Sequence, residues 1–143
     1  MIAGSIAERK LDSLRRCLER VRCRCPDSAE ALVVDVDAQD IVSLNLTRAV
    51  QRCVDIGAQL LAGSAGAPPQ TMAQTFIRLA QEGIISTELA ERLRGAVGFR
   101  NIAIHEYDEI DWHIVYAIAT RNLTDFEDFA RAALACLGGS TQP

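Results

Sequence analysis

Apolar residues recur along nearly the whole chain at alternating steps of three and four, and this spacing most constrains the fold. Such a period places one apolar seam on the face of an α-helix. The first seam covers residues 2–24, and Pro26 ends that helix. The widest seam covers residues 37–62, which predicts a central helix. Further helices are predicted at residues 70–82, from Ser86 or Thr87 to about Asn101, and at residues 109–137.

Short segments without this period separate the predicted helices. Residues 26–36 are expected to form a connector, because their valines would make a lone strand with nothing to pair with. Residues 63–69, "GSAGAPP", read as a loop, and residues 138–143 as a flexible tail. One seam per helix and short links predict a single all-α domain over residues 1–143, an antiparallel up-down bundle of four to five helices.

The composition argues against several classes of protein. No window approaches the ~20 apolar residues of a membrane span, and residues 1–9 lack the apolar run of a signal peptide. We therefore expect a cytoplasmic protein without a membrane partner. Five cysteines and no export signal argue against a disulfide framework, and Cys23 and Cys25 are too close for a zinc knuckle.

The basic residues are concentrated at the N-terminus, although the net charge is −4. Residues 1–25 hold seven bases and three acids, a local charge of +4 that leaves −8 for the rest. Six of the seven bases are arginine, whose planar fork suits phosphate. This strip is either a solvated helix face or a surface that contacts RNA or an acidic partner protein.

The stretch "VGFRNIAIHEYDEID", residues 97–111, interrupts the apolar pattern with Arg100, which occupies the next core position of its seam. His105 and Tyr107 follow it. On a continuous helix Arg100 and His105 would stand ~140° apart and ~7.5 Å apart along the axis. A helix that frays after about Asn101 would let the three side chains converge, with Asp108 or Asp111 capping the next helix.

These three residues suit the cleavage of RNA. Arg100 can hold a phosphate and stabilise the charge that grows on it, and His105 titrates near neutrality and can move protons. The set lacks a nucleophile and a carboxylate cage for a metal, but the 2′-hydroxyl of RNA is its own nucleophile. The pair therefore suits metal-free cleavage to a 2′,3′-cyclic phosphate. Two alternatives stay open: a salt-bridged Arg100 beside a core His105, or a metal site built from His105, Glu106 and His113.

The stretch also resembles the R-x4-H-x-Y signature of the HepT family, helical-bundle ribonucleases of the HEPN superfamily. Residues 45–61, "NLTRAVQRCVDIGAQLL", resemble the second helix of that family. Residues 76–93, "FIRLAQEGIISTELAERL", resemble the run that leads to the signature. The likeness covers about residues 45–129, whereas the first 40 residues match only as an amphipathic helix.

The resemblance implies a homodimeric toxin of a toxin–antitoxin pair, with Arg100 and His105 catalytic and the motifs of two subunits facing each other across a cleft. It implies a small MntA-like nucleotidyltransferase antitoxin that silences the toxin by transferring AMP from ATP to Tyr107. The resemblance also allows the toxin dimer and the antitoxin to form a larger hetero-oligomer. ATP and magnesium would serve that partner, and no cofactor or DNA is expected for this chain. The rival hypothesis is a non-catalytic helical partner of a nucleotidyltransferase. Asn101 and, from charge and helix phase, Arg48 and Arg52 are further candidate RNA contacts.

Overall fold

The computed structural model describes residues 2–139, and within them every regular element is helical, as predicted. Residues 140–143 of the expected tail lie outside the described residues, and its first two belong to the last helix. In chain order the elements are α1 (Ile2–Arg24), α2 (Ala29–Val34), α3 (Val36–Leu61), α4 (Met72–Gln81), α5 (Thr87–His105), the 3-10 turn η1 (Tyr107–Glu109), α6 (Trp112–Thr120) and α7 (Leu123–Gly139).

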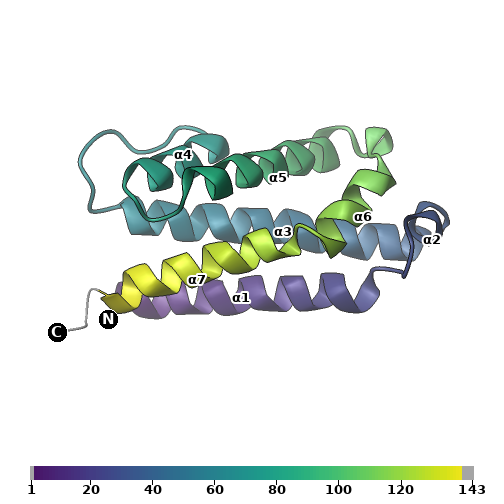
Figure 1. The fold of residues 1–143 in the computed structure, drawn as a ribbon, viewed down its shortest axis with the longest axis horizontal. Coiled ribbons are helices and arrows are strands. Elements are labelled where there is room, and N and C mark those ends of the chain that lie inside the picture. The colour runs from purple at the N-terminus through teal and green to yellow at the C-terminus, as the bar shows by residue number, and fades with distance from the viewer. Residues whose placement is uncertain (1, 140–143) are drawn as a thin grey trace.

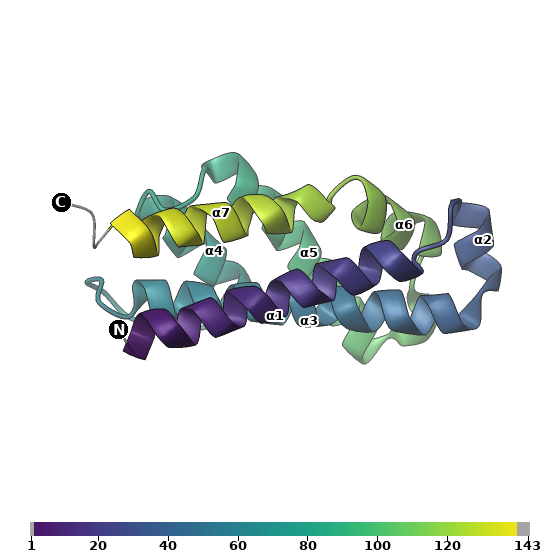
Figure 2. The same cartoon turned by 90° about the horizontal axis from the view of Figure 1, so that it is seen from below.

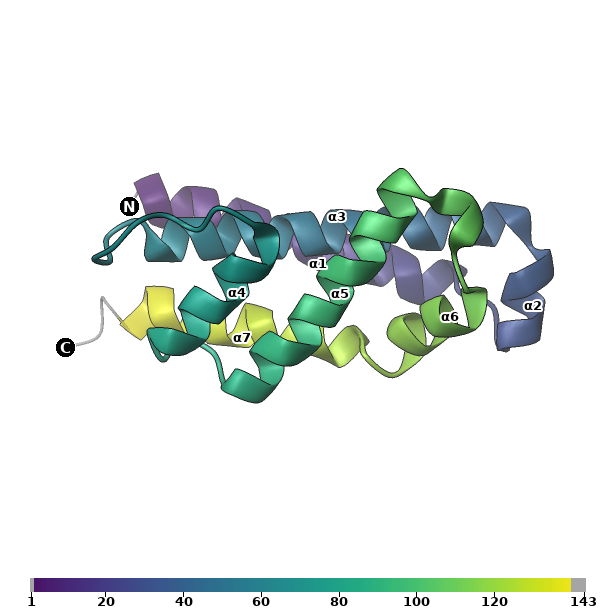
Figure 3. The same cartoon turned by 90° about the horizontal axis from the view of Figure 1, so that it is seen from above.

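Helix α3 is the centre of the bundle, in agreement with its wide apolar seam. It packs antiparallel against α1 along most of its length and also contacts α4, α5, α6 and α7 (Figure 1). Figure 2 shows α7 lying along the same layer as α1. Figure 3 shows α4 and α5 crossing the opposite face of α3, and the chain turning from the end of α5 into α6.

The predicted seams form the core. Leu14 and Val21 of α1 and Val42, Leu46 and Ile56 of α3 are completely buried. Phe76 of α4 meets Phe129 of α7 edge to face, with ring centroids 5.9 Å apart. The aromatic pair joins the two outer layers across the bundle.

Side-chain caps set the helix starts. The side chain of Ser86 accepts a hydrogen bond from the Leu89 amide, which confirms one of the two predicted caps of α5. Asp111 caps α6 by accepting from the His113 amide, so it, and not Asp108, starts that helix. Gly83, with φ of 78°, follows the end of α4 at the predicted stop.

The prediction of a connector at residues 26–36 is wrong, because part of it is the short helix α2. Ser28 caps that helix, and Leu32 is completely buried. The side-chain amide of Gln39 donates to the carbonyls of Leu32 and Val33 at the helix end. Six residues are too few to show a helical period, so the sequence pattern alone could not reveal this element.

The prediction of one helix over residues 109–137 is also wrong. The chain forms η1, α6 and α7, and a break at Arg121 and Asn122 separates the last two helices. The backbone carbonyl of Asn122 accepts a hydrogen bond from the Asp125 amide at 3.0 Å at the start of α7. The apolar spacing continues across the break, which is why the period did not reveal it.

Among residues 2–139, no helix has the length and apolar character needed to cross a bilayer. All five cysteines are free thiols, and Cys53 of α3 is completely buried. Burial strongly raises the pKa of the Cys53 thiol, which keeps it protonated and inert.

Candidate functional site

Arg100 and His105 lie on the last two turns of one continuous helix. The predicted fraying of α5 after about Asn101 is wrong, because the helix runs to His105 and ends where the Glu106 amide donates to the Ile102 carbonyl at 2.8 Å. Five helical residues turn ~500°, so the two side chains leave the axis ~140° apart. Within one chain, the helix therefore directs the guanidinium and the imidazole to different sides.

The Arg100 side chain is half-buried, and its guanidinium is only partly satisfied. Its Nη1 donates to Oδ1 of Asn101 at 3.3 Å, and it forms no ion pair with any acid in the described part of the chain. Its Nε is buried without a hydrogen-bond partner. A buried, unpaired donor is costly, typically by about 1–3 kcal/mol. Arg100 is therefore not held in the structural salt bridge that the alternative interpretation requires.

His105 is exposed at the C-terminal end of α5, and no hydrogen bond or ion pair ties it to residues 2–139. It is therefore not a satisfied core histidine, which was the other half of that alternative. An exposed imidazole at this position is free to exchange protons with a substrate. Asn101 is also exposed beside it.

Tyr107 is fixed at both ends of its ring. Its hydroxyl donates a hydrogen bond to Oδ1 of Asp40 in α3 at 2.6 Å, and its ring meets Trp112 edge to face at 5.8 Å. Partial burial, and then the hydrogen bond to Asp40, raise the pKa of the Tyr107 phenol. Tyr107 as a residue is 38% exposed, so it is held by these contacts while part of it stays open to solvent.

Apolar side chains surround this end of the molecule. Ile102 and Ile104 of α5 are 42% and 47% exposed, and Leu44 of α3 is 48% exposed. Such residues flank the polar motif on the same helices that carry Arg100 and Asp40. The motif thus lies on a partly apolar surface.

Arg48 and Arg52 lie on α3 but are not brought to Arg100. Nε of Arg52 donates to Oγ of Ser13 in α1 at 3.0 Å, so this side chain faces α1. Arg48 is exposed and acts electrostatically on Cys17, also in α1. Their role as RNA contacts stays a prediction, and any such contact would lie along the junction of α1 and α3.

The structure offers no support for the metal-site alternative. His113 is exposed, with Nδ1 3.7 Å from Oδ1 of Asp111. Nowhere in residues 2–139 do three His, Cys, Asp or Glu side chains gather so that they would hold a metal ion.

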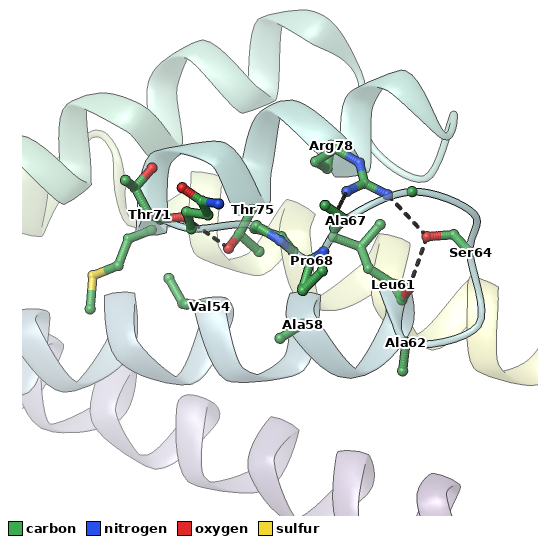
Figure 4. A pocket seen from close by; sticks show the side chains of 14 residues that line it. Val54, Ala58, Leu61, Ala62, Ser64, Ala67, Pro68, Thr71, Thr75 and Arg78 are labelled. Atoms are coloured by element: carbon green, nitrogen blue, oxygen red, sulfur yellow. Dashed lines mark hydrogen bonds between the residues drawn. The ribbon is translucent and has the colours of Figure 1, made fainter.

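A separate cavity of about 420 Å³ lies under the loop at residues 63–69, away from the motif (Figure 4). Arg78 of α4 reaches into this loop and donates to the Ser64 hydroxyl and to the carbonyls of Ala65 and Ala67. The arginine thereby ties the loop to α4. No motif residue lines this cavity.

The family model described as "Ribonuclease HepT-like" matches residues 11–133, which include the whole motif. The chain belongs to the ribonuclease HepT-like family. The resemblance that residues 97–111 indicated is thus confirmed. The match to the family model begins at residue 11 and so also includes most of α1. The family makes the chain a ribonuclease.

Individual HepT relatives cover almost the whole chain. The mRNA nuclease HepT of Shewanella oneidensis is 34% identical over 120 residues, 84% of this chain and 90% of that protein. The tRNA nuclease HepT of Aphanizomenon flos-aquae is 26% identical over 126 residues, 88% of this chain and 86% of that protein. A solved structure of a tri-AMPylated Shewanella oneidensis HEPN toxin in complex with MNT antitoxin superposes with a TM-score of 0.85. It is 33% identical and covers 91% of this chain and 97% of that chain.

One residue of this candidate site, Asp40, was not predicted from the sequence. Asp40 lies 67 positions before Tyr107, in a different helix, and nothing in its local sequence marks it. Only the packing of the turn after α5 against the first turns of α3 brings the carboxylate to the phenol.

Proposed function

We propose that this chain is the toxin of a toxin–antitoxin pair and that it cleaves RNA without a metal ion, using Arg100 and His105. One observation carries the proposal: the guanidinium and the imidazole lie at the end of one helix, neither is engaged by an acid, and His105 is open to solvent. If Arg100 and His105 served only the fold, other groups of the same chain would satisfy their hydrogen-bonding groups. The exposed imidazole of His105 and the guanidinium of the half-buried Arg100, which no acid neutralises, suit a ligand that brings negative charge, here a phosphate.

The chemistry uses the nucleophile of the substrate. A histidine takes the proton of the ribose 2′-hydroxyl, the 2′-oxygen bonds to the adjacent phosphorus, and the bond from phosphorus to the 5′-oxygen breaks. The same histidine, now protonated, returns a proton to that 5′-oxygen. Arg100 stabilises the charge that builds on the phosphate oxygens. The products are a 2′,3′-cyclic phosphate and a 5′-hydroxyl.

A second copy of the chain completes the site in this proposal. Arg100 and His105 of one chain diverge by ~140° on the continuous helix, so a guanidinium can meet an imidazole most simply across a two-fold axis. The exposed Leu44, Ile102 and Ile104 support this arrangement, because a partner would cover their apolar surface.

Neutralisation would occur by modification of Tyr107. The related HEPN toxin of Shewanella oneidensis is tri-AMPylated and is held in complex with MNT antitoxin. We infer that a similar nucleotidyltransferase partner uses ATP and magnesium to transfer AMP to the Tyr107 hydroxyl. The added phosphodiesters would place negative charge close to Arg100 and block the approach of RNA.

The test compares the purified wild type with His105→Ala on a fluorescent single-stranded RNA in the presence of EDTA. We expect wild-type cleavage to leave 2′,3′-cyclic phosphate ends and His105→Ala to lose about 10²–10⁴-fold in rate. His113→Ala, the matched control at the other histidine, should cleave normally. Cleavage that EDTA abolishes, or that His105→Ala retains, contradicts the mechanism. A wild type that binds a nucleotidyltransferase but cuts no RNA favours the docking-partner alternative.

A further inference from the structure

The contact between Asp40 and Tyr107 joins two distant parts of the chain. The phenolic hydroxyl donates to Oδ1 of Asp40 at 2.6 Å, the length expected of a hydrogen bond to an ionised carboxylate. Asp40 is exposed, and no arginine, lysine or histidine of residues 2–139 forms an ion pair with it. Its carboxylate is therefore free to accept a proton.

The contact also sets the direction of the hydroxyl. Trp112 supports the ring edge to face, and Asp40 takes the hydroxyl hydrogen, so the oxygen is held at one place on the surface. The hydroxyl hydrogen points toward Asp40, and the buried side chain of Ser43 interacts with the same oxygen, so the remaining lone pair is the one left for an incoming phosphorus atom. Tyr107 is 38% exposed, so part of the residue is open to an approaching nucleotide.

We propose that Asp40 positions the Tyr107 hydroxyl and accepts its proton when Tyr107 is modified with AMP; this inference rests on the proposed function. The phenolic oxygen bonds to the α-phosphorus of ATP. The bond from that phosphorus to the bridging oxygen of pyrophosphate breaks, and pyrophosphate leaves with the electron pair. The proton moves from the phenol to the Asp40 carboxylate and then to water.

A proton acceptor is needed here because the phenol is neutral near pH 7. Burial and the hydrogen bond to Asp40 raise the pKa of Tyr107, so free phenolate is scarce. The hydroxyl becomes strongly acidic only as its oxygen bonds to phosphorus, and a carboxylate already in contact takes the proton at that moment. Protein kinases place an aspartate against the substrate hydroxyl for the same purpose.

The experiment measures the rate of AMP transfer by intact mass at several pH values between 6.5 and 9.5. The wild type, Asp40→Asn and Asp40→Glu are each incubated with an active MNT-type nucleotidyltransferase and magnesium–ATP. Asp37→Asn is the matched control, because Asp37 is exposed in the first turn of the same helix. We expect Asp40→Asn to lose about 10²-fold at pH 7. The deficit should shrink as the pH rises, because ionisation of the phenol replaces the missing base.

The controls separate this inference from the proposed function. Asp37→Asn should behave as the wild type, and Asp40→Glu, which keeps a carboxylate, should keep the wild-type pH profile. A transfer rate that Asp40→Asn leaves unchanged, or lowers by one constant factor at every pH, overturns the role of Asp40. If Tyr107→Phe takes up AMP like the wild type, or the wild type takes up none, the proposed acceptor itself is wrong. If Tyr107→Phe takes up no AMP but Asp40→Asn takes it up like the wild type, Tyr107 is the acceptor and Asp40 has no role in the transfer.

Discussion

At the scale of single residues, Arg100 of the candidate site lowers the stability of the fold. Arg100 occupies a position that the apolar seam of α5 would otherwise fill with a hydrophobic residue, and its Nε is buried without a partner. The fold could avoid this cost with any apolar side chain of similar size. The arginine is therefore best explained by function.

Replacing Arg100 by leucine should separate stability from activity. The change removes the unsatisfied donor, so we expect Arg100→Leu to raise the free energy of unfolding by about 1 kcal/mol while RNA cleavage is lost. Urea denaturation and the RNA assay measure the two effects. Arg94→Leu is the control, because Arg94 is exposed and already paired with Glu91 in the same helix, and it should give no such gain. A less stable Arg100→Leu would show that the guanidinium is a structural group.

At the scale of elements, the close crossing of α3 and α4 depends on Gly57. A Cβ atom at this position would lie 2.7 Å from Cγ2 of Thr75 and 2.9 Å from Cδ1 of Leu79. Both of these α4 residues are buried, so neither side chain can move freely. The absence of a side chain at Gly57 therefore sets how closely the two helices approach.

Gly57→Ala should destabilise the protein although alanine is the better helix former. We expect a net loss of about 1–2 kcal/mol, because overpacking at the crossing outweighs the gain in helix propensity of about 1 kcal/mol. Gly95→Ala in α5 is the matched control, since nothing lies within 4 Å of its added Cβ, and it should stabilise. Chemical denaturation of both variants gives the comparison. An increase in stability for Gly57→Ala would mean that the helices can separate at no cost.

The sequence predicted helices well where the apolar period and the capping residues indicate the same boundaries. It predicted them less well where tertiary contacts determine the boundary. The seams of α1 and α3 and the Ser86 cap followed from spacing and residue type. The break at Asn122 did not, because Ala119, Leu123 and Phe126 continue the three-four spacing across it. The candidate site behaved in the same way. Its motif was visible in the chain, but Asp40 reaches it only through packing.

At the scale of the whole molecule, the continuous α5 determines how the site can be assembled. The helix carries Arg100 and His105 to its end, and helical geometry makes their side chains leave the axis ~140° apart. If the proposed two-fold arrangement holds, the arginine of one subunit works with the histidine of the other. Each site then needs only one intact residue from each chain.

Mixing two inactive variants tests this claim most directly. Arg100→Ala and His105→Ala are each purified, assayed for RNA cleavage, then mixed in equal amounts and allowed to exchange subunits, with mixed dimers verified by native mass spectrometry. Each mixed dimer would hold one complete pair, and half of the dimers should be mixed, so we predict a return to about a quarter of wild-type activity. Mixed dimers that form and cleave no RNA would contradict the shared site.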